Sequence, residues 1–483
     1  MKRTTYITYL TAILASAISP AIAAQSTSEL INKVIGAYGG NVLTSTQSIK
    51  LIDYNKGPWP GESENPGLPE VWRINEELTI DFDRKRKALV SYRVPRTTLD
   101  LEKWIFDGKQ GIKYDIFHQK YANVDWLSFN NLGGSIVRSS DTMHAKHLQD
   151  NLGSADYLGD EYFRGKIHHK LQVKKLTGGQ FTYYIDNASG LINKAIRHHP
   201  SATLVYVFSN HQVEDGLTYA SDMNFFVNGE LRLMSVKRGL ERQPDLQTAF
   251  YKPSKFEHWG ETIDSSQLKT KQISKQLFQV GKGRSKTVFV EQADHFIAIG
   301  GANAISANFA ELSPINKGDK PLRYFVVTHH HRDNLTGLND VVELGAKLIV
   351  ARAHQTSVQS SLSNANAQNA MVIIEDGQQL NVGNLTLFDI ATAHSQHYLL
   401  AYMPGNRLII AEEHYESNLL DGKPRIYKDM VRFADALVEL NLDVNKLIDV
   451  RSWRQFSYDE FKSWTDNFEE KVCPAGYEVC SGG

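Results

Sequence analysis

Cysteine is almost missing from this chain, because only Cys473 and Cys480 occur among its 483 residues. Their spacing fits neither a Cys-x-x-Cys redox motif nor a zinc ribbon. In an oxidising compartment such a pair forms a disulfide. We therefore expect a structural disulfide that constrains a loose C-terminal tail, residues 471–483, and has no catalytic or metal-binding role.

An excess of either charge is also lacking, since 53 Lys and Arg oppose 54 Asp and Glu and the formal net charge is -1. Nucleic-acid binding requires a concentrated positive patch. The basic run 84–87 follows Asp81 and Asp83 and is typical of a solvated hairpin. We therefore expect a small-molecule substrate and no nucleic acid as partner, and the sequence leaves the oligomeric state open.

Long apolar runs are missing after the first two dozen residues. There, Lys2 and Arg3 precede an apolar run from Tyr6 to about Ile18, and small residues follow at 21–24. This order is typical of a secretory signal peptide. A membrane anchor needs about 20 apolar residues without the Thr and Ser interruptions seen here. We expect residues 1–24 to be cleaved and the mature protein to be periplasmic or secreted, without an integral membrane segment.

The length exceeds what one hydrophobic core usually serves, so two domains are expected. Residues 25–265 contain a short helical pattern at Ser28–Tyr38, an amphipathic one at about Ile136–Leu152, and many short stretches rich in aromatic and β-branched residues. Their alternation predicts a mainly antiparallel β-sheet domain with covering helices. The expected strands are 77–82, 89–94, 103–106, 111–116, 167–174, 180–185, 192–198, 202–210 and 230–236.

This first half resembles periplasmic lipoprotein-carrier folds, in which a curved antiparallel sheet wraps around helices. The resemblance rests on the meander order and on the segments Trp104–Gly108 and Asp215–Leu217. It implies an apolar ligand in the N-terminal domain. The alternative, which we prefer, is a platform that shapes or covers the second half.

Residues 266–470 alternate strand-like and helical segments, which predicts a layered α/β domain and makes the whole chain α+β / α/β. An apolar strand, Tyr324–Val327, runs directly into Thr328-His-His-His-Arg-Asp-Asn-Leu-Thr-Gly337. In an extended loop His329, His331 and Asp333 share one face, because side chains two apart point the same way. Imidazole and carboxylate groups in this array are ligands that Zn²⁺ prefers.

The motif Thr328-His329-x-His331-x-Asp333 after a buried strand resembles the signature of the metallo-β-lactamase superfamily, over roughly residues 268–470. The resemblance implies an αββα sandwich. It also implies that His394 is the third histidine ligand, and that Glu413 stands where the family has an aspartate bridging two metals.

Three positions depart from the family pattern. Asn334 replaces a histidine of the second metal site, Ser452 is the best match to the last histidine, and Gly300 replaces an early aspartate. His329, His331 and His394 supply three imidazoles, which with one water make an open tetrahedral site. A second site would be oxygen-rich and weaker for zinc. Its candidate ligands are Asp333, Glu413 and Asn334, with His397 or His414 as additions.

These features predict an exported metal-dependent hydrolase with one Zn²⁺, a second zinc being doubtful and another divalent transition metal an alternative. The metal would activate a water, and Asp333 would orient that water and accept its proton as the catalytic residue. The bond attacked would be an ester, lactone, amide or similar one. The sequence keeps a second reading open, a catalytically impaired scaffold serving as a binding or structural module. An oxygen- or redox-handling enzyme is a third, disfavoured by the incomplete two-metal ligand set.

Overall fold

The computed structural model describes residues 27–481 apart from residues 60, 96–97, 177–178 and 364–369. The expected signal peptide, residues 1–24, lies outside these described residues. Within them, no helix has both the length and the apolar composition required to cross a membrane.

The first half of the described chain forms one sheet of fourteen strands, in the order β14-β6-β5-β4-β3-β2-β1-β13-β12-β11-β10-β9-β8-β7. Two consecutive meanders meet where β1 pairs antiparallel with β13, and the short β14 pairs parallel with β6. The strands are β1 (Ser48–Trp59), β2 (Glu70–Asp81), β3 (Arg86–Val94), β4 (Asp100–Phe106), β5 (Gly111–Asp115), β6 (Lys120–Asn123), β7 (Ala155–Phe163), β8 (Lys166–Leu176), β9 (Gly179–Asp186), β10 (Ile192–His199), β11 (Ala202–Glu214), β12 (Leu217–Val227), β13 (Glu230–Arg242) and β14 (Glu257–His258).

Helices cover one part of this sheet, as expected from the apolar alternation along its strands. They are α1 (Thr27–Ala37), α2 (Asn41–Ser45), α3 (Gly134–Ser139), α4 (Asp141–Gln149) and the linker helix α5 (Leu246–Ala249). Leu30 and Val34 of α1 and Leu148 of α4 are buried in one core with strand residues such as Leu78 and Phe181. Burial of these side chains holds the helices on the sheet.

The amphipathic segment expected as one helix at about Ile136–Leu152 is instead two helices, α3 and α4. Ser140 interrupts it, because its backbone is extended and its hydroxyl accepts a hydrogen bond from the backbone N–H of Met143. This is the geometry of an N-cap, so a new helix starts at Asp141. The strands β1, β6, β7, β12 and the short β14 were not among those expected from the sequence.

Two further sheets make up the second half. The seven-stranded sheet contains β15 (Lys269–Ser274), β16 (Leu277–Lys282), β17 (Ser285–Glu291), β18 (Phe296–Ile299), β19 (Leu322–Val326), β20 (Lys347–Ala351) and β21 (Met371–Ile374), in this order. The six-stranded sheet contains β22 (Gln379–Val382), β23 (Leu385–Ile390), β24 (Tyr398–Met403), β25 (Leu408–Ala411), β26 (Lys446–Asp449) and β27 (Gln455–Ser457).

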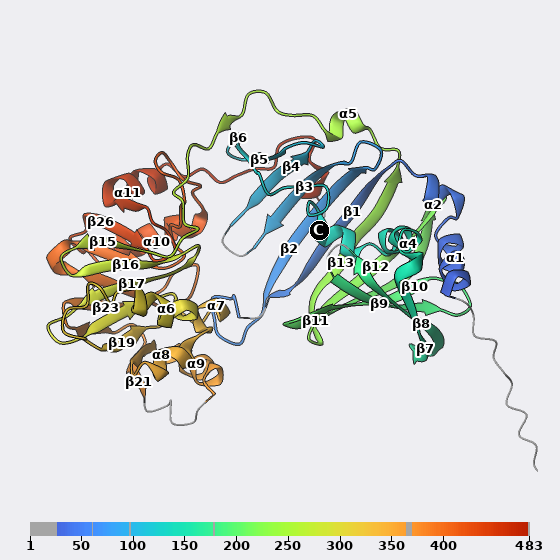
Figure 1. The fold of residues 1–483 in the computed structure, drawn as a ribbon. Coiled ribbons are helices and arrows are strands. Elements are labelled where there is room, and N and C mark those ends of the chain that lie inside the picture. Colours follow the sequence, from blue (N-terminus) through green and yellow to red (C-terminus); the bar gives the residue numbers. More distant parts are fainter. Residues whose placement is uncertain (1–26, 60, 96–97, 177–178, 364–369, 482–483) are drawn as a thin grey trace, which may run out of the picture.

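The two sheets face each other across a core shared by both, with Val288 and Ile349 on one side and Leu387 and Ile410 on the other. The other face of the seven-stranded sheet packs on α6 (Ile305–Glu311), α8 (Leu338–Glu343) and α9 (Gln355–Ser361). The other face of the six-stranded sheet packs on α10 (Lys428–Glu439) and α11 (Tyr458–Asp466). Helices therefore flank a pair of sheets (Figure 1).

The C-terminal tail returns to the first sheet, and the C mark in Figure 1 lies among its strands. Cys473 and Cys480 form the expected disulfide. Val479 is buried beside Tyr54 and Leu101, and its carbonyl accepts a hydrogen bond of 2.6 Å from Nδ2 of Asn75. The expectation of a loose end was wrong, because apolar side chains of the tail are buried against the sheet.

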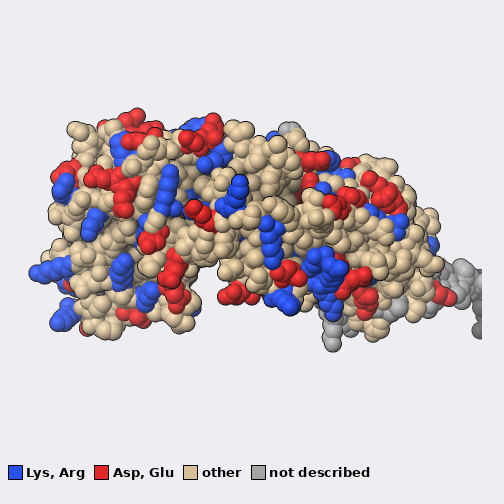
Figure 2. All heavy atoms as spheres, turned by 90° about the horizontal axis from the view of Figure 1, so that it is seen from above, with Lys and Arg blue, Asp and Glu red and all other residues tan. Residues whose placement is uncertain are grey.

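The two halves form lobes separated by a hollow on the face seen in Figure 2, where acidic and basic side chains are interspersed over both lobes. A cavity of about 470 Å³ lies between them, lined by residues of the first half such as Leu99 and of the second such as Tyr427 and Asp429.

Candidate metal centre

Two of the predicted ligands, His329 and His331, follow β19 in a segment that remains extended up to His331. Alternation therefore puts both side chains on one face. Both residues are buried, and their ring centroids lie 4.3 Å apart.

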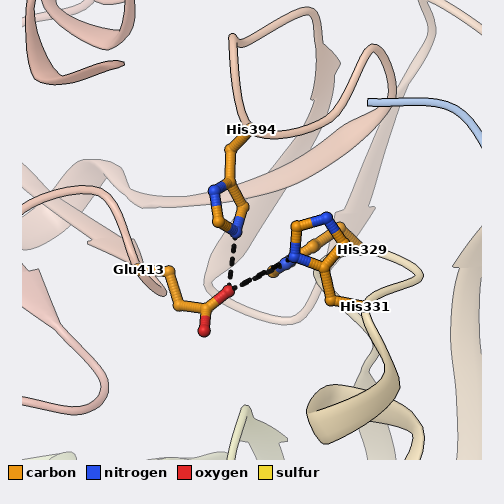
Figure 3. A group of neighbouring side chains, drawn as sticks. All are labelled: His329, His331, His394 and Glu413. Atoms are coloured by element: carbon orange, nitrogen blue, oxygen red, sulfur yellow. Dashed lines mark hydrogen bonds and ion pairs between the residues drawn. The ribbon is translucent and has the colours of Figure 1, made fainter. Parts of the chain in front are cut away.

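His394 joins them from the connection between β23 and β24, with its ring centroid 4.7 Å from that of His329 and 4.4 Å from that of His331. Glu413, just after β25, points its carboxylate into the same space (Figure 3). Its Oε2 lies 2.6 Å from Nε2 of His394, 3.1 Å from Nε2 of His329 and 3.7 Å from Nδ1 of His331. One ligand atom from each of the four residues lies within 4.8 Å of the others.

The opposite ring nitrogens of the three histidines lie near oxygen atoms, and the amide nitrogen of Asn334 lies 3.1 Å from Nδ1 and 2.9 Å from Nε2 of His329. Nδ1 of His329 lies 3.1 Å from Oγ1 of Thr328, which itself donates to Glu412. Nε2 of His331 lies 3.2 Å from the carbonyl oxygen of Ser63, and Nδ1 of His394 lies 3.7 Å from Oδ2 of Asp429. An acceptor on one side places the ring proton there and directs the lone pair of the other nitrogen inward.

Burial suits these rings to the role of neutral ligands. The pKa of His329 is held well below its usual value, first by burial and then by the neighbouring His331 and His394. Neutral imidazole is the form that coordinates a metal. The donor set present, three imidazoles and a carboxylate, therefore fits a divalent transition metal such as Zn²⁺.

Two further carboxyl groups lie near Arg451 and Glu413: Asp449 accepts from the backbone N–H of Arg451, and Glu416 pairs with Arg284. Burial, followed by the charge of Glu416, raises the pKa of Asp449 to about 8. Burial also raises the pKa of Glu416 itself. These raised pKa values mean that the charged carboxylates are disfavoured there, and a nearby cation would stabilise them.

The first half contributes a segment to the centre, Gly61–Glu64, which we call the strap. It belongs to the connection between β1 and β2, which reaches α7 (Arg332–Leu335) in Figure 1. The backbone N–H of Arg332 donates to the carbonyl of Gly61, and that of Gln396 donates to the carbonyl of Glu64. Because Ser63 also contacts His331, the strap touches both loops that carry the histidines.

The carboxylate of Asp333 contacts Arg451 and not the three imidazoles. The extended backbone ends at His331 and α7 begins at Arg332, so the alternation that would align Asp333 with the two histidines stops one residue too early. Its carboxylate, about half exposed, pairs with Nη1 of Arg451 at 2.9 Å. Asp333 is not in the group of ligand atoms around Glu413.

Arg451 contacts the centre, although no sequence pattern predicted a role for it. It follows β26, and its guanidinium contacts Asp333, Asn334, Glu412 and Glu413. A single arginine forms no motif, so nothing in the sequence marked it out. Glu412, Ser63 and Asp429 were missed for the same reason.

Two of the departures from the family pattern have a structural account. Gly300 has a left-handed backbone (φ 67°), and a Cβ there would lie 3.0 Å from the carboxylate of Glu412, which fills the space an aspartate would need. Ser452 is fully buried and its hydroxyl donates to the carbonyl of Ser417.

The remaining nearby histidines are not in the group of ligand atoms around Glu413, although His414 packs on His394 with ring centroids 5.5 Å apart and its Nδ1 lies 3.5 Å from Oδ2 of Asp429. His330 stacks on His354 with ring centroids 4.8 Å apart, and His354 donates to the carbonyl of His397. The His397 ring lies 2.9 Å from Oδ2 of Asp389. His414 stacks on Phe433 in the core at 4.3 Å.

No known family profile matches the chain, and no curated protein matches it either. About two fifths of the chain is similar to solved metallo-β-lactamase structures. One, from Hirschia baltica, is 17% identical and covers 40% of this chain and 94% of its own, with a TM-score of 0.32. Another, from Pontibacter korlensis, is 15% identical over 42% of this chain and 100% of its own, with a TM-score of 0.34. The flavodiiron protein from Giardia intestinalis is 12% identical over 41% of this chain and 60% of its own, with a TM-score of 0.32.

Proposed function

We propose that this chain is an exported, metal-dependent hydrolase of the metallo-β-lactamase type that uses one divalent ion, Zn²⁺, held by His329, His331 and His394. The observation that carries the proposal is the orientation of the three rings. Nε2 of His329, Nδ1 of His331 and Nε2 of His394 face Glu413, while the opposite nitrogens face Thr328, Ser63 and Asp429. Rings that only fill a core have no need of such convergence.

An ion bound there would polarise the scissile bond and lower the pKa of its bound water toward about 7. The carboxylate of Glu413 has an oxygen within 4.8 Å of a ring nitrogen of all three imidazoles. Glu62 of the strap lies 3.5 Å from Nδ1 of His331. The Glu413 carboxylate can act as fourth ligand or accept a proton from the attacking water. Asp333, to which the sequence assigned that proton, is not in the group of ligand atoms that contains the three imidazoles, so we assign the role to Glu413.

Two further features support the class of enzyme and its location. The helix-flanked pair of sheets, with the histidine motif leaving β19, agrees with the sandwich that the sequence resembles. Export is supported by the signal-like residues 1–24 and by the Cys473–Cys480 disulfide, which needs an oxidising compartment. The substrate is an ester, lactone, amide or phosphoester, among which the fold does not choose.

Metal analysis of the purified protein tests the proposal. We expect one transition-metal ion per chain in the wild type, its loss in His331→Ala, and its retention in His330→Ala, because His330 stacks on His354 outside the centre. Chelation should abolish hydrolysis of a panel of esters, lactones, amides and phosphoesters, and Zn²⁺ should restore it. Wild-type protein without metal, or equal metal in the wild type and His331→Ala, would contradict the proposal.

A second candidate is a scaffold that binds metal without turnover, as a binding or structural module. It is favoured by the 0% and 1% exposure of His329 and His331 beneath the strap, which leaves little room for a substrate at these rings. One bound ion per chain together with no hydrolysis across the panel would support this candidate.

For the first half we propose the platform role, because its strap contacts the histidine loops directly. The alternative to this platform role is that the first half binds an apolar ligand, which stays a prediction.

A further inference from the structure

We propose that the guanidinium of Arg451 takes the place of a second metal ion and restricts the centre to one. The inference rests on the proposed function and concerns how many ions the centre accepts. The oxygen donors from which a second site would be built are Asp333, Asn334 and Glu413. All three are in contact with Arg451.

All three nitrogens of the Arg451 guanidinium take part in these contacts. Nη1 lies 2.9 Å from Oδ2 of Asp333 and also contacts Oε1 of Glu413. Nη2 donates to Oδ1 of Asn334 at 2.6 Å, and Nε donates to Oε1 of Glu412 at 3.2 Å. A guanidinium offers five N–H donors in a fixed fork, so it can satisfy several acceptors that would otherwise need a metal.

Glu413 links this arginine to the histidines. Its Oε2 faces the three imidazoles, whereas its Oε1 faces Arg451. The carboxylate thus bridges the metal position and a second positive charge, and that charge is supplied by a side chain.

The charges balance with one divalent ion. Asp333, Glu412, Glu413 and Glu416 carry four formal negative charges, and Arg451 and Arg284 supply two positive charges. One divalent ion among the imidazoles brings the sum to zero. A second would have to share the same oxygens with a guanidinium, and two cations close together in a buried site repel each other.

Arg451 is held in place from its backbone as well. Its N–H donates to Oδ1 of Asp449 at 2.8 Å, and its carbonyl accepts a hydrogen bond of 2.8 Å from Nζ of Lys286. The side chain is only 7% exposed. A cation so positioned cannot swing into solvent to admit an ion without breaking several buried contacts.

Titration of metal-free protein with Co²⁺ tests the inference, with the number of ions per chain read from d–d absorption and from metal analysis after gel filtration. We expect the wild type to stop at one ion even at large excess, Arg451→Ala and Arg451→Ser to accept two, and Arg451→Lys, which keeps the charge, to stay at one. Arg454→Ala is the matched control, because its guanidinium lies over Phe456 and donates to the carbonyl of Asp421. It should also stay at one.

The outcomes separate the two proposals. No ion in the wild type would contradict the proposed function. One ion in the wild type and one in folded Arg451→Ala and Arg451→Ser would contradict only the role of Arg451. The wild-type titration needs no variant, so two ions in the wild type would overturn the inference even if the substitutions prevented folding.

Discussion

At the scale of single residues, each imidazole of the centre has its ring nitrogens in different surroundings. The side facing Glu413 is where a cation would sit, and on the other side His329 and His331 have an oxygen within hydrogen-bond distance, whereas Asp429 lies 3.7 Å from His394. Thr328 has a further role because its hydroxyl donates to Glu412, which in turn pairs with Arg451. The histidines and the arginine are therefore parts of one hydrogen-bonded system.

Thr328→Val should weaken metal binding. The substitution keeps the shape of the side chain but removes the acceptor for Nδ1 of His329, and loss of such a partner typically lowers metal affinity about 10- to 100-fold. Competition with a chromophoric chelator measures the change. Thr336→Val is the control, because that exposed hydroxyl donates to the carbonyl of Arg332. Equal metal affinities of Thr328→Val and Thr336→Val would refute the role of Thr328.

A second prediction concerns His144, which is buried in the first half. Its Nε2 donates to the carbonyl of Arg138 at 2.8 Å, and Nδ1 accepts from the Tyr183 hydroxyl at 3.0 Å. Burial lowers its pKa from 6.5 to about 4. Between these values the unfolded chain binds more protons than the folded one, so stability is complete above pH 6.5 and declines as the pH falls toward 4.

The His144→Gln variant should lose this part of the pH dependence, which amounts to about 3 kcal/mol at most. The measurement is the free energy of unfolding in urea at pH 7.5, 6, 5 and 4. His199→Gln, at an exposed position, should follow the wild type. Parallel curves for the wild type and His144→Gln would show that His144 is not responsible.

At the scale of elements, the strap shows how a hairpin of the first half can contact a candidate metal centre in the second half. The strands β1 and β2 pair up to Trp59 and Glu70, where the rings of Trp59 and Trp72 stack at 4.5 Å. A two-residue turn could join the strands at this point. The much longer connection reaches the second half and contacts His331.

Replacing residues 60–69 with Asn-Gly should remove the strap while keeping the hairpin. We expect an intact first half, judged by near-UV circular dichroism from the tryptophan pair, and metal affinity lowered about 10- to 100-fold because His331 loses its acceptor. Ser63→Ala is the control, since the acceptor is the main-chain carbonyl and remains. Equal affinity in the shortened variant and the wild type would rule out a contribution of the strap.

At the scale of the whole molecule, one arginine of the second half joins three carboxylates of the first. Arg425 lies 2.6 Å from Asp115, 3.0 Å from Glu102 and 3.3 Å from Asp100. Its side chain is 22% exposed, so the cluster is mostly removed from water. Together with the tail and the strap, this cluster holds the two halves against each other.

Arg425→Met should loosen that contact. Removing one partner of a buried ion network costs about 3–5 kcal/mol because the remaining charges stay buried, and partial exposure reduces this figure here. We expect a lower thermal midpoint and faster proteolysis of the linker between β14 and β15. Arg407→Met is the control, since its pair with Asp443 is exposed and such pairs contribute about 0–1 kcal/mol. Identical proteolysis of both variants would show that Arg425 does not join the halves.

Local features were predictable from sequence because they depend on neighbours along the chain. Helix α1 lies within a residue of the expected Ser28–Tyr38, and the disulfide pairs the only two cysteines. By contrast, β1 was missed because buried polar residues such as Asp53 break its apolar alternation. Asp53 is tolerated there because Arg238 of β13, far along the chain, pairs with it at 3.2 Å.

The sequence by itself determined the candidate ligand types and the histidine spacing, since both follow from residue identity and from the extended backbone after a buried strand. Only the tertiary structure decided that Asp333 turns away, that Arg451 meets the carboxylates, and that Ser63 of the first half faces His331. Along the chain, Asp333 and Arg451 are 118 residues apart, and Glu413 and Arg451 are 38 apart. Ser63 and His331 are 268 residues apart. Distances through space between such remote segments are set by how the sheets and lobes pack, which no local pattern encodes.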